Sequence, residues 1–181
     1  MKPGRTGESG FTLIELMISL GLFALIAVAG VALVDGIIKV QGRTEARLDR
    51  LADIQRTMFV LTSDLDQIAR GRVAGGGTNL SFTRAAPGQG GPPVALRYLV
   101  AGGALVRTAG PGAQPLLTGV NAARWRFWDG QWRDRWPFDE KSIDRWPSAI
   151  AIELQAQDPG GNPATLRRVV ALPARPEEPN P

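Results

Sequence analysis

Residue types that commonly carry out enzyme chemistry are sparse in this chain of 181 residues, which contains no cysteine and no histidine. The composition therefore excludes thiol nucleophiles, histidine-dependent catalytic triads and zinc sites made from these two residue types. Asp134, Asp139, Glu140 and Asp144 lie close together, but basic residues are interspersed among them and no calcium-loop pattern is present. We interpret these carboxylates as solvated ion pairs. The expectation is a protein that is not an enzyme and that uses no metal and no cofactor.

One carboxylate, Glu15, directly precedes residues 16–34, which carry no charge. A charge at the centre of a membrane helix costs about 2.5–3.5 kcal/mol, and less toward the ends, so a compensating charge is expected. If the chain is cut between Gly10 and Phe11, the new terminal ammonium group of a neighbouring subunit could pair with Glu15. Such a pair would also fix the axial stagger between subunits. These residues therefore indicate assembly rather than catalysis.

A second candidate site lies in residues 120–147, which contain all five tryptophans. Asp129 and Gly130 form a dipeptide that is typical of a tight hairpin turn. Tryptophan and arginine dominate protein–protein contacts, although core filling and the covering of a sheet edge are the more ordinary interpretation. The candidate interface residues are Trp132, Arg133, Arg135 and Trp136.

Hydrophobic periodicity predicts the helices that position these residues. Residues 11–34 are long and apolar enough for a transmembrane and assembly helix. From 35 to 71, apolar residues recur at spacings of three and four, which predicts an amphipathic helix continuing into the globular domain. Its charged residues, Asp64 among them, are assigned to the solvent-facing sides. Gly71 and the flexible glycine run 75–77 are expected to end this helix.

Alternating residues predict a β-rich globular domain over residues 72–173, with strands at 79–83, 94–100, 104–107, 120–128, 148–157 and 166–172. Segments rich in glycine and proline between them are predicted loops. The proline-rich residues 174–181 are predicted to be a disordered tail. The expected fold class is α+β, with one long helix packed on antiparallel sheet.

The N-terminal residues resemble the leader of type IV pilins and pseudopilins, because a short basic segment 1–10 ends in Gly10 and is followed by Phe11, Glu15 and an apolar stretch. This resemblance implies that a prepilin peptidase cuts between Gly10 and Phe11 and methylates the amino group of Phe11. It also implies that Glu15 is the assembly carboxylate and that the fold is pilin-like. Lys2 and Arg5 would keep the leader cytoplasmic. The chain would then cross the bacterial inner membrane once, with its C-terminal domain in the periplasm.

The C-terminal half is similar to the J-type minor pseudopilins of type II secretion systems. The similarity rests on the tryptophan-rich strand pair, the strand Pro147–Leu154 and the final strand Leu166–Pro173. It implies a structural subunit at the pseudopilus tip, beside the I- and K-type minor pseudopilins, that helps to initiate assembly and the export of folded proteins. It leaves contact with the H type and the major pseudopilin open.

Two other interpretations remain open at this stage. A minor type IV pilin that binds DNA or a surface would carry the same leader, but the net charge of +4 is small and the arginines are scattered, so no nucleic acid is expected. An ordinary signal peptidase could instead cut after Ala29 and release a soluble exported domain. Glu15 within the apolar region argues against that second interpretation.

Overall fold

The computed structural model describes residues 12–86, 90–158 and 162–175. Gly10 and Phe11 therefore lie outside the described residues. The chain divides into two compact units, Met1–Ala46 and Arg47–Pro181. The helix α1, Leu13–Asp66, contributes residues to both units.

The first unit contains the apolar part of α1. Its large apolar side chains are exposed from Leu13, at 79%, to Val40, at 63%. Among the described residues, α1 is the one helix that is long and apolar enough to cross a membrane. Thr12 precedes the helix and its carbonyl oxygen accepts a hydrogen bond from the Glu15 amide at 3.1 Å. Because this surface has no covering layer within the unit, it suits lipid or the helices of other chains.

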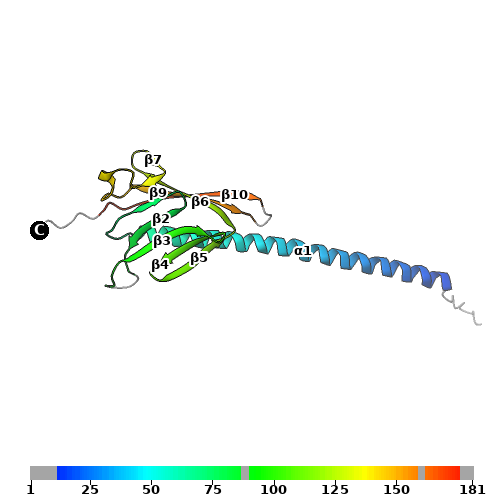
Figure 1. The fold of residues 1–181 in the computed structure, drawn as a ribbon. Helices are drawn as coiled ribbons and strands as arrows, with labels where there is room; N and C mark the ends of the chain where they lie inside the picture. Colours follow the sequence, from blue (N-terminus) through cyan, green and yellow to red (C-terminus); the bar gives the residue numbers. More distant parts are fainter. Residues whose placement is uncertain (1–11, 87–89, 159–161, 176–181) are drawn as a thin grey trace, which may run out of the picture. The chain divides into compact units, whose positions relative to one another are not determined.

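The second unit contains two antiparallel sheets and the last turns of α1 (Figure 1). Sheet A has the spatial order β5-β4-β3-β2-β1-β8. In that order the strands are Gly112–Thr118, Ala104–Ala109, Val94–Ala101, Asn79–Arg84, Ala74–Gly76 and Arg135–Trp136. Sheet B has the order β10-β9-β6-β7. In that order the strands are Pro163–Ala171, Ala149–Gln157, Val120–Trp128 and Trp132–Arg133. A short 3-10 helix, η1, spans Glu140–Ser142.

The core of this unit lies between the two sheets and the end of α1. Leu61 and Leu65 of α1 are buried in the same cluster as Tyr98 of β3 and as Trp125 and Phe127 of β6. Strand β6 follows the predicted alternation, since Trp125 and Phe127 are buried while Arg126 between them is partly exposed. The expected α+β class and antiparallel sheet are therefore confirmed, and so is the hairpin at Asp129 and Gly130, where β6 pairs with β7.

The helix ends at Asp66, before the predicted end at residue 71. Beyond it the chain takes extended pairing with β2, because Ala69 donates a backbone hydrogen bond to Thr83 at 2.8 Å and Ile68 forms a bridge with Arg84. These partners replace a further helical turn. The predicted apolar face is also buried only in its second half, since Leu48 remains 60% exposed.

The glycine run 75–77 is not the flexible link that was predicted. Gly75 and Gly76 belong to β1, which pairs with β2 on one side and β8 on the other. A Cβ atom on Gly75 would lie 2.8 Å from the carbonyl oxygen of Asn79 and 2.9 Å from the ring of Phe127. Glycine is therefore required by close packing at this point. Strand β5, Gly112–Thr118, is not among the predicted strands.

Candidate assembly and binding sites

Glu15 lies in the first turn of α1, where the helix dipole favours a negative charge. Its side chain is exposed, and it has no ion-pair partner among the residues that the structure describes. The carboxylate is therefore open to a cation from another chain. Gly10 and Phe11, the predicted cleavage and methylation residues, lie outside the described part, so their roles remain predictions.

Asp64 is not on a solvent-facing side of α1 as predicted, because it is only 1% exposed. Its carboxylate accepts hydrogen bonds from the phenol of Tyr98 and from the guanidinium groups of Arg84 and Arg107. The second contact with Arg107, from Nη2 to Oδ1, measures 3.0 Å. These bonds offset the cost of burying the charge. They join the last turns of α1 to β2, β3 and β4 of sheet A.

The cluster around Asp64 changes the ionisation of its neighbours. Burial, followed by the hydrogen bond to Asp64, raises the pKa of Tyr98 far above its ordinary value. The hydrogen bond to Asp64 also raises the pKa of Arg107. A signal for this site exists in the sequence, because Asp64 follows Leu61 by three residues and therefore shares its buried side of the helix.

The four predicted interface residues do not form one surface. Trp136 is a core residue, 2% exposed, and its Nε1 donates to the carbonyl oxygen of Arg145 at 3.2 Å. This corrects the prediction for Trp136, whose pairing opposite Gly75 in sheet A leads its ring into the core. Arg135 is exposed in sheet A, whereas Trp132 and Arg133 belong to sheet B.

Trp132 is the centre of a side-chain group on the outer face of sheet B. Its ring lies 5.8 Å from the guanidinium carbon of Arg126 and 5.6 Å from that of Arg167. The ring of Trp128 packs edge-on against it at 5.2 Å between centroids. We call Arg126, Trp128, Trp132 and Arg167 the Trp132 patch. The guanidinium of Arg133 instead lies over the ring of Phe138, 4.3 Å from its centroid, and so belongs to a different contact.

Two of the clustered carboxylates form ion pairs as predicted, but with arginines from outside the cluster instead of the basic residues interspersed among them. Asp134 lies 3.1 Å from Arg124 and 3.2 Å from Arg126, and Asp144 lies 3.8 Å from Arg72. Asp139 differs, because its side chain caps η1 by accepting from the amide of Ser142 at 2.8 Å. Hydrogen bonding with Ser142, from its side chain first and then from its backbone, lowers the pKa of Asp139. Within the described ranges there is no group of three or more metal-ligating side chains.

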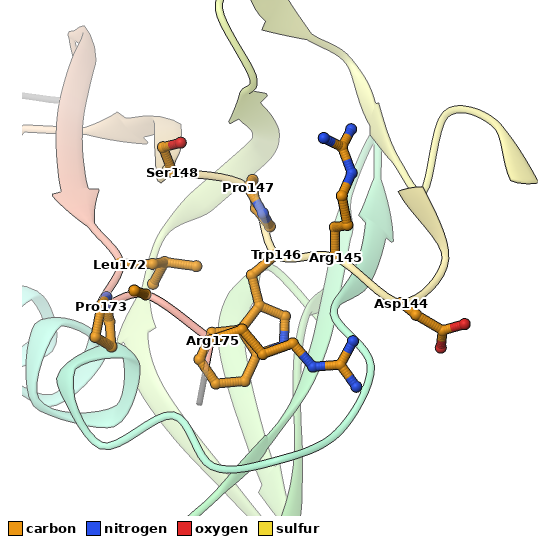
Figure 2. Close-up of a pocket in the computed structure, with 9 residues that line it drawn as sticks. Asp144, Arg145, Trp146, Pro147, Ser148, Leu172, Pro173 and Arg175 are labelled. Atoms are coloured by element: carbon orange, nitrogen blue, oxygen red, sulfur yellow. The ribbon is translucent and has the colours of Figure 1, made fainter. Parts of the chain in front are cut away.

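A pocket of about 410 Å³ lies where the chain enters β9 and leaves β10 (Figure 2). The amide of Leu172 donates to the carbonyl oxygen of Ser148 at 2.9 Å, which joins the two segments. Trp146 lies in the middle of the lining residues, and its Nε1 donates to the carbonyl oxygen of Gly71 at 2.9 Å. The lining residues are Asp144, Arg145, Trp146, Pro147, Ser148, Leu172, Pro173, Ala174 and Arg175. The tryptophan count drew attention to this region, but the pocket depends on the return of β10, which local sequence patterns do not show.

Comparison with known families and structures agrees with this geometry. The family model for protein J of the type II secretion system matches residues 32–172. The model for the prokaryotic N-terminal methylation motif matches residues 5–31, a range that contains Gly10, Phe11 and Glu15. A chain in the crystal structure of the GspK-GspI-GspJ complex from the enterotoxigenic Escherichia coli type 2 secretion system has a similar fold, with a TM-score of 0.55 and 23% identity. That match covers 71% of the present chain and 99% of the other. Because the first family model spans most of the sequence, the chain belongs to the type II secretion system protein J family.

Proposed function

We propose that this protein is a minor pseudopilin that acts at the pseudopilus tip, where it helps to initiate assembly and the export of folded proteins. The observation that carries this proposal is the succession, along one chain, of a methylation motif and a protein J match. The exposed apolar part of α1 fits an inner-membrane anchor, with the Arg47–Pro181 unit in the periplasm. The protein J family consists of structural subunits, and we infer that this chain acts by assembly and catalyses no reaction.

Processing at the N-terminus is part of the proposal. A prepilin peptidase would cut between Gly10 and Phe11 and methylate Phe11, leaving a positively charged amine close to the start of α1. The exposed carboxylate of Glu15 would then accept the terminal amine of a neighbouring subunit. In this proposal residues 1–10 are the leader, residues 11–34 the transmembrane and assembly helix, and residues 72–173 the globular domain.

The proposed partners are the I- and K-type minor pseudopilins, because the similar solved chain occurs in a complex of GspK, GspI and GspJ. Contact with the H type and the major pseudopilin would follow from the same filament. Leu48 and Phe59 of α1, which are 60% and 73% exposed, provide apolar surface within the globular unit. Trp132 and the exposed Arg135 remain candidate contacts, on two different sheets.

Mass spectrometry of the membrane-extracted protein tests the processing step. We expect a mature chain that begins with methylated Phe11, and we expect Gly10→Asp to leave the leader attached. A mature chain beginning at Gly30 would contradict the proposal, because the assembly helix would be lost.

Glu15→Gln tests assembly. This variant should remain folded and membrane-bound. Much less I- and K-type pseudopilin should co-purify with it, and secretion should fall. Glu45→Gln is the matched control, because Glu45 is also an exposed carboxylate on α1. Equal recovery of partners with both variants would remove the proposed role of Glu15.

A further inference from the structure

The pocket around Trp146 has an apolar part in its wall. The indole N–H of Trp146 is already bonded to Gly71, so the ring can offer only its apolar faces. Pro147, Leu172 and Pro173 add further apolar lining. A volume of about 410 Å³ falls in the range of about 300–1,000 Å³ that is typical of ligand pockets.

One charge in the pocket lacks compensation. The carboxylate of Asp144 pairs with Arg72, and Arg145 pairs with Asp129 at 3.0 Å. Arg175 is half-buried, yet its guanidinium makes no ion pair or hydrogen bond with any residue that the structure describes. A guanidinium in this position favours a carboxylate, which it can bind through two parallel hydrogen bonds.

The pocket wall also offers unpaired backbone. Ala174 and Arg175 follow the end of β10 at Ala171 and belong to no strand. Among the described residues their amides form no backbone hydrogen bonds. An extended peptide can bind such groups through its own main chain, while its side chains enter the neighbouring pocket.

We propose that this pocket binds an extended segment of a partner protein that places a carboxylate on Arg175 and an apolar side chain against Trp146 and Leu172. The proposal rests on the proposed function only in assuming that the globular unit meets other proteins. The carboxylate would pair with the guanidinium of Arg175, and the apolar side chain would fill the space between the indole and Leu172.

Fluorine NMR of the full chain in detergent, labelled with fluorotryptophan, tests this pocket directly. The chain has five tryptophans, so the Trp146 signal can be assigned by its loss in Trp146→Phe. The probe is the capped tripeptide acetyl-Leu-Glu-Pro-amide, and the matched neutral probe is acetyl-Leu-Gln-Pro-amide. We expect the acidic probe to shift the Trp146 signal and the neutral probe to bind about tenfold more weakly, as the loss of one charged hydrogen-bonded contact requires.

Two arginine variants separate the pocket from general attraction of an acidic peptide. Arg175→Gln should weaken binding of the acidic probe by about tenfold, to the affinity of the neutral probe. Arg97→Gln is the control, because Arg97 is exposed on β3 and does not line the pocket, and it should leave binding unchanged.

Several results would overturn the proposal. These are an unmoved Trp146 signal, equal binding of both probes, or equal effects of the two arginine variants. If the double variant Glu177→Gln and Glu178→Gln shifts the Trp146 signal without any probe, the occupant of the pocket is the chain's own tail and not a partner. None of these results bears on N-terminal processing, so failure here is distinguishable from failure of the pseudopilin function.

Discussion

The carboxylate of Asp64, near the end of α1, accepts a hydrogen bond from the phenol of Tyr98 on β3. Both side chains are buried, and Arg84 and Arg107 supply the positive charge that balances the acid. No basic residue occupies the last turn of α1, so this compensation comes from the sheet instead of the helix. The packing of α1 on sheet A therefore depends on a polar contact as well as on Leu61 and Leu65.

Removal of the Asp64 charge should destabilise the globular unit strongly. Asp64→Ala leaves Arg84 and Arg107, whose side chains are 18% and 14% exposed, without their anion. We expect a loss of about 3 kcal/mol or more in the free energy of unfolding, measured by chemical denaturation. Asp66→Ala is the control, because Asp66 is exposed on the same helix end and should cost less than about 0.5 kcal/mol. Similar losses in both variants would contradict the assigned role of Asp64.

The raised pKa of Tyr98 predicts sensitivity to alkaline pH. In the unfolded chain a tyrosine ionises near pH 10, whereas the folded state keeps the proton on Tyr98. Its contribution is therefore fully present below about pH 10 and is lost as the pH rises above that value. Tyr98→Phe should show a shallower loss of stability in this range.

Ultraviolet titration provides the second measurement for Tyr98, because the chain contains one tyrosine. In the folded protein, tyrosinate absorbance should appear only together with unfolding. Smooth ionisation near pH 10 with the fold intact would show that the phenol is not held by Asp64.

A side chain at Gly75 should disturb the contact between the two sheets. The added methyl of Gly75→Ala would meet backbone of β2 and the ring of Phe127, which predicts a loss of about 1–3 kcal/mol in unfolding experiments. Gly42→Ala is the matched control, since nothing lies within 4 Å of its Cβ position and alanine is the better helix former. A harmless Gly75→Ala would mean that β1 is not packed as described.

Substitution of Trp132 should mainly impair assembly, whereas substitution of Trp136 should mainly lower the stability of the fold. Trp136→Ala removes a core side chain and should cost about 3–5 kcal/mol of folding free energy. Trp132→Ala should cost much less stability but should reduce recovery of partner pseudopilins on co-purification. If Trp132→Ala unfolds the protein as readily as Trp136→Ala, the Trp132 patch is structural and not a contact surface.

Sequence patterns predicted the strands that have one buried and one exposed face. Strand β6 was predicted with its observed bounds, because Trp125 and Phe127 alternate with outward-facing residues. Strand β1 could not be found in this way, since glycines carry no hydrophobic period. Strand β5 shows no alternation of apolar and polar residues, because most of its residues, Pro115 among them, are exposed whichever face of the sheet they lie on.

The candidate sites show a similar division. Glu15 is a candidate from the sequence because a lone carboxylate stands beside an apolar span, and the structure adds that its side chain is exposed; its role in assembly stays a prediction. The separation of Trp132 from Trp136 could not, because it depends on which sheet each two-residue strand joins. The charge of Asp64 wrongly predicts an exposed side chain, whereas its spacing from Leu61 places it on the buried side of the helix.

The order of strands in sheet A has a consequence for how the domain folds as it emerges on the far side of a membrane. From β2 to β5, each strand pairs with the one just before it in the chain, so most of this sheet can form progressively with short loop closures. Sheet B differs, because β6 pairs along most of its length with β9, which comes much later in the chain. Vectorial delivery from the N-terminus would therefore complete sheet A, apart from its edge strand β8, while sheet B is still unpaired.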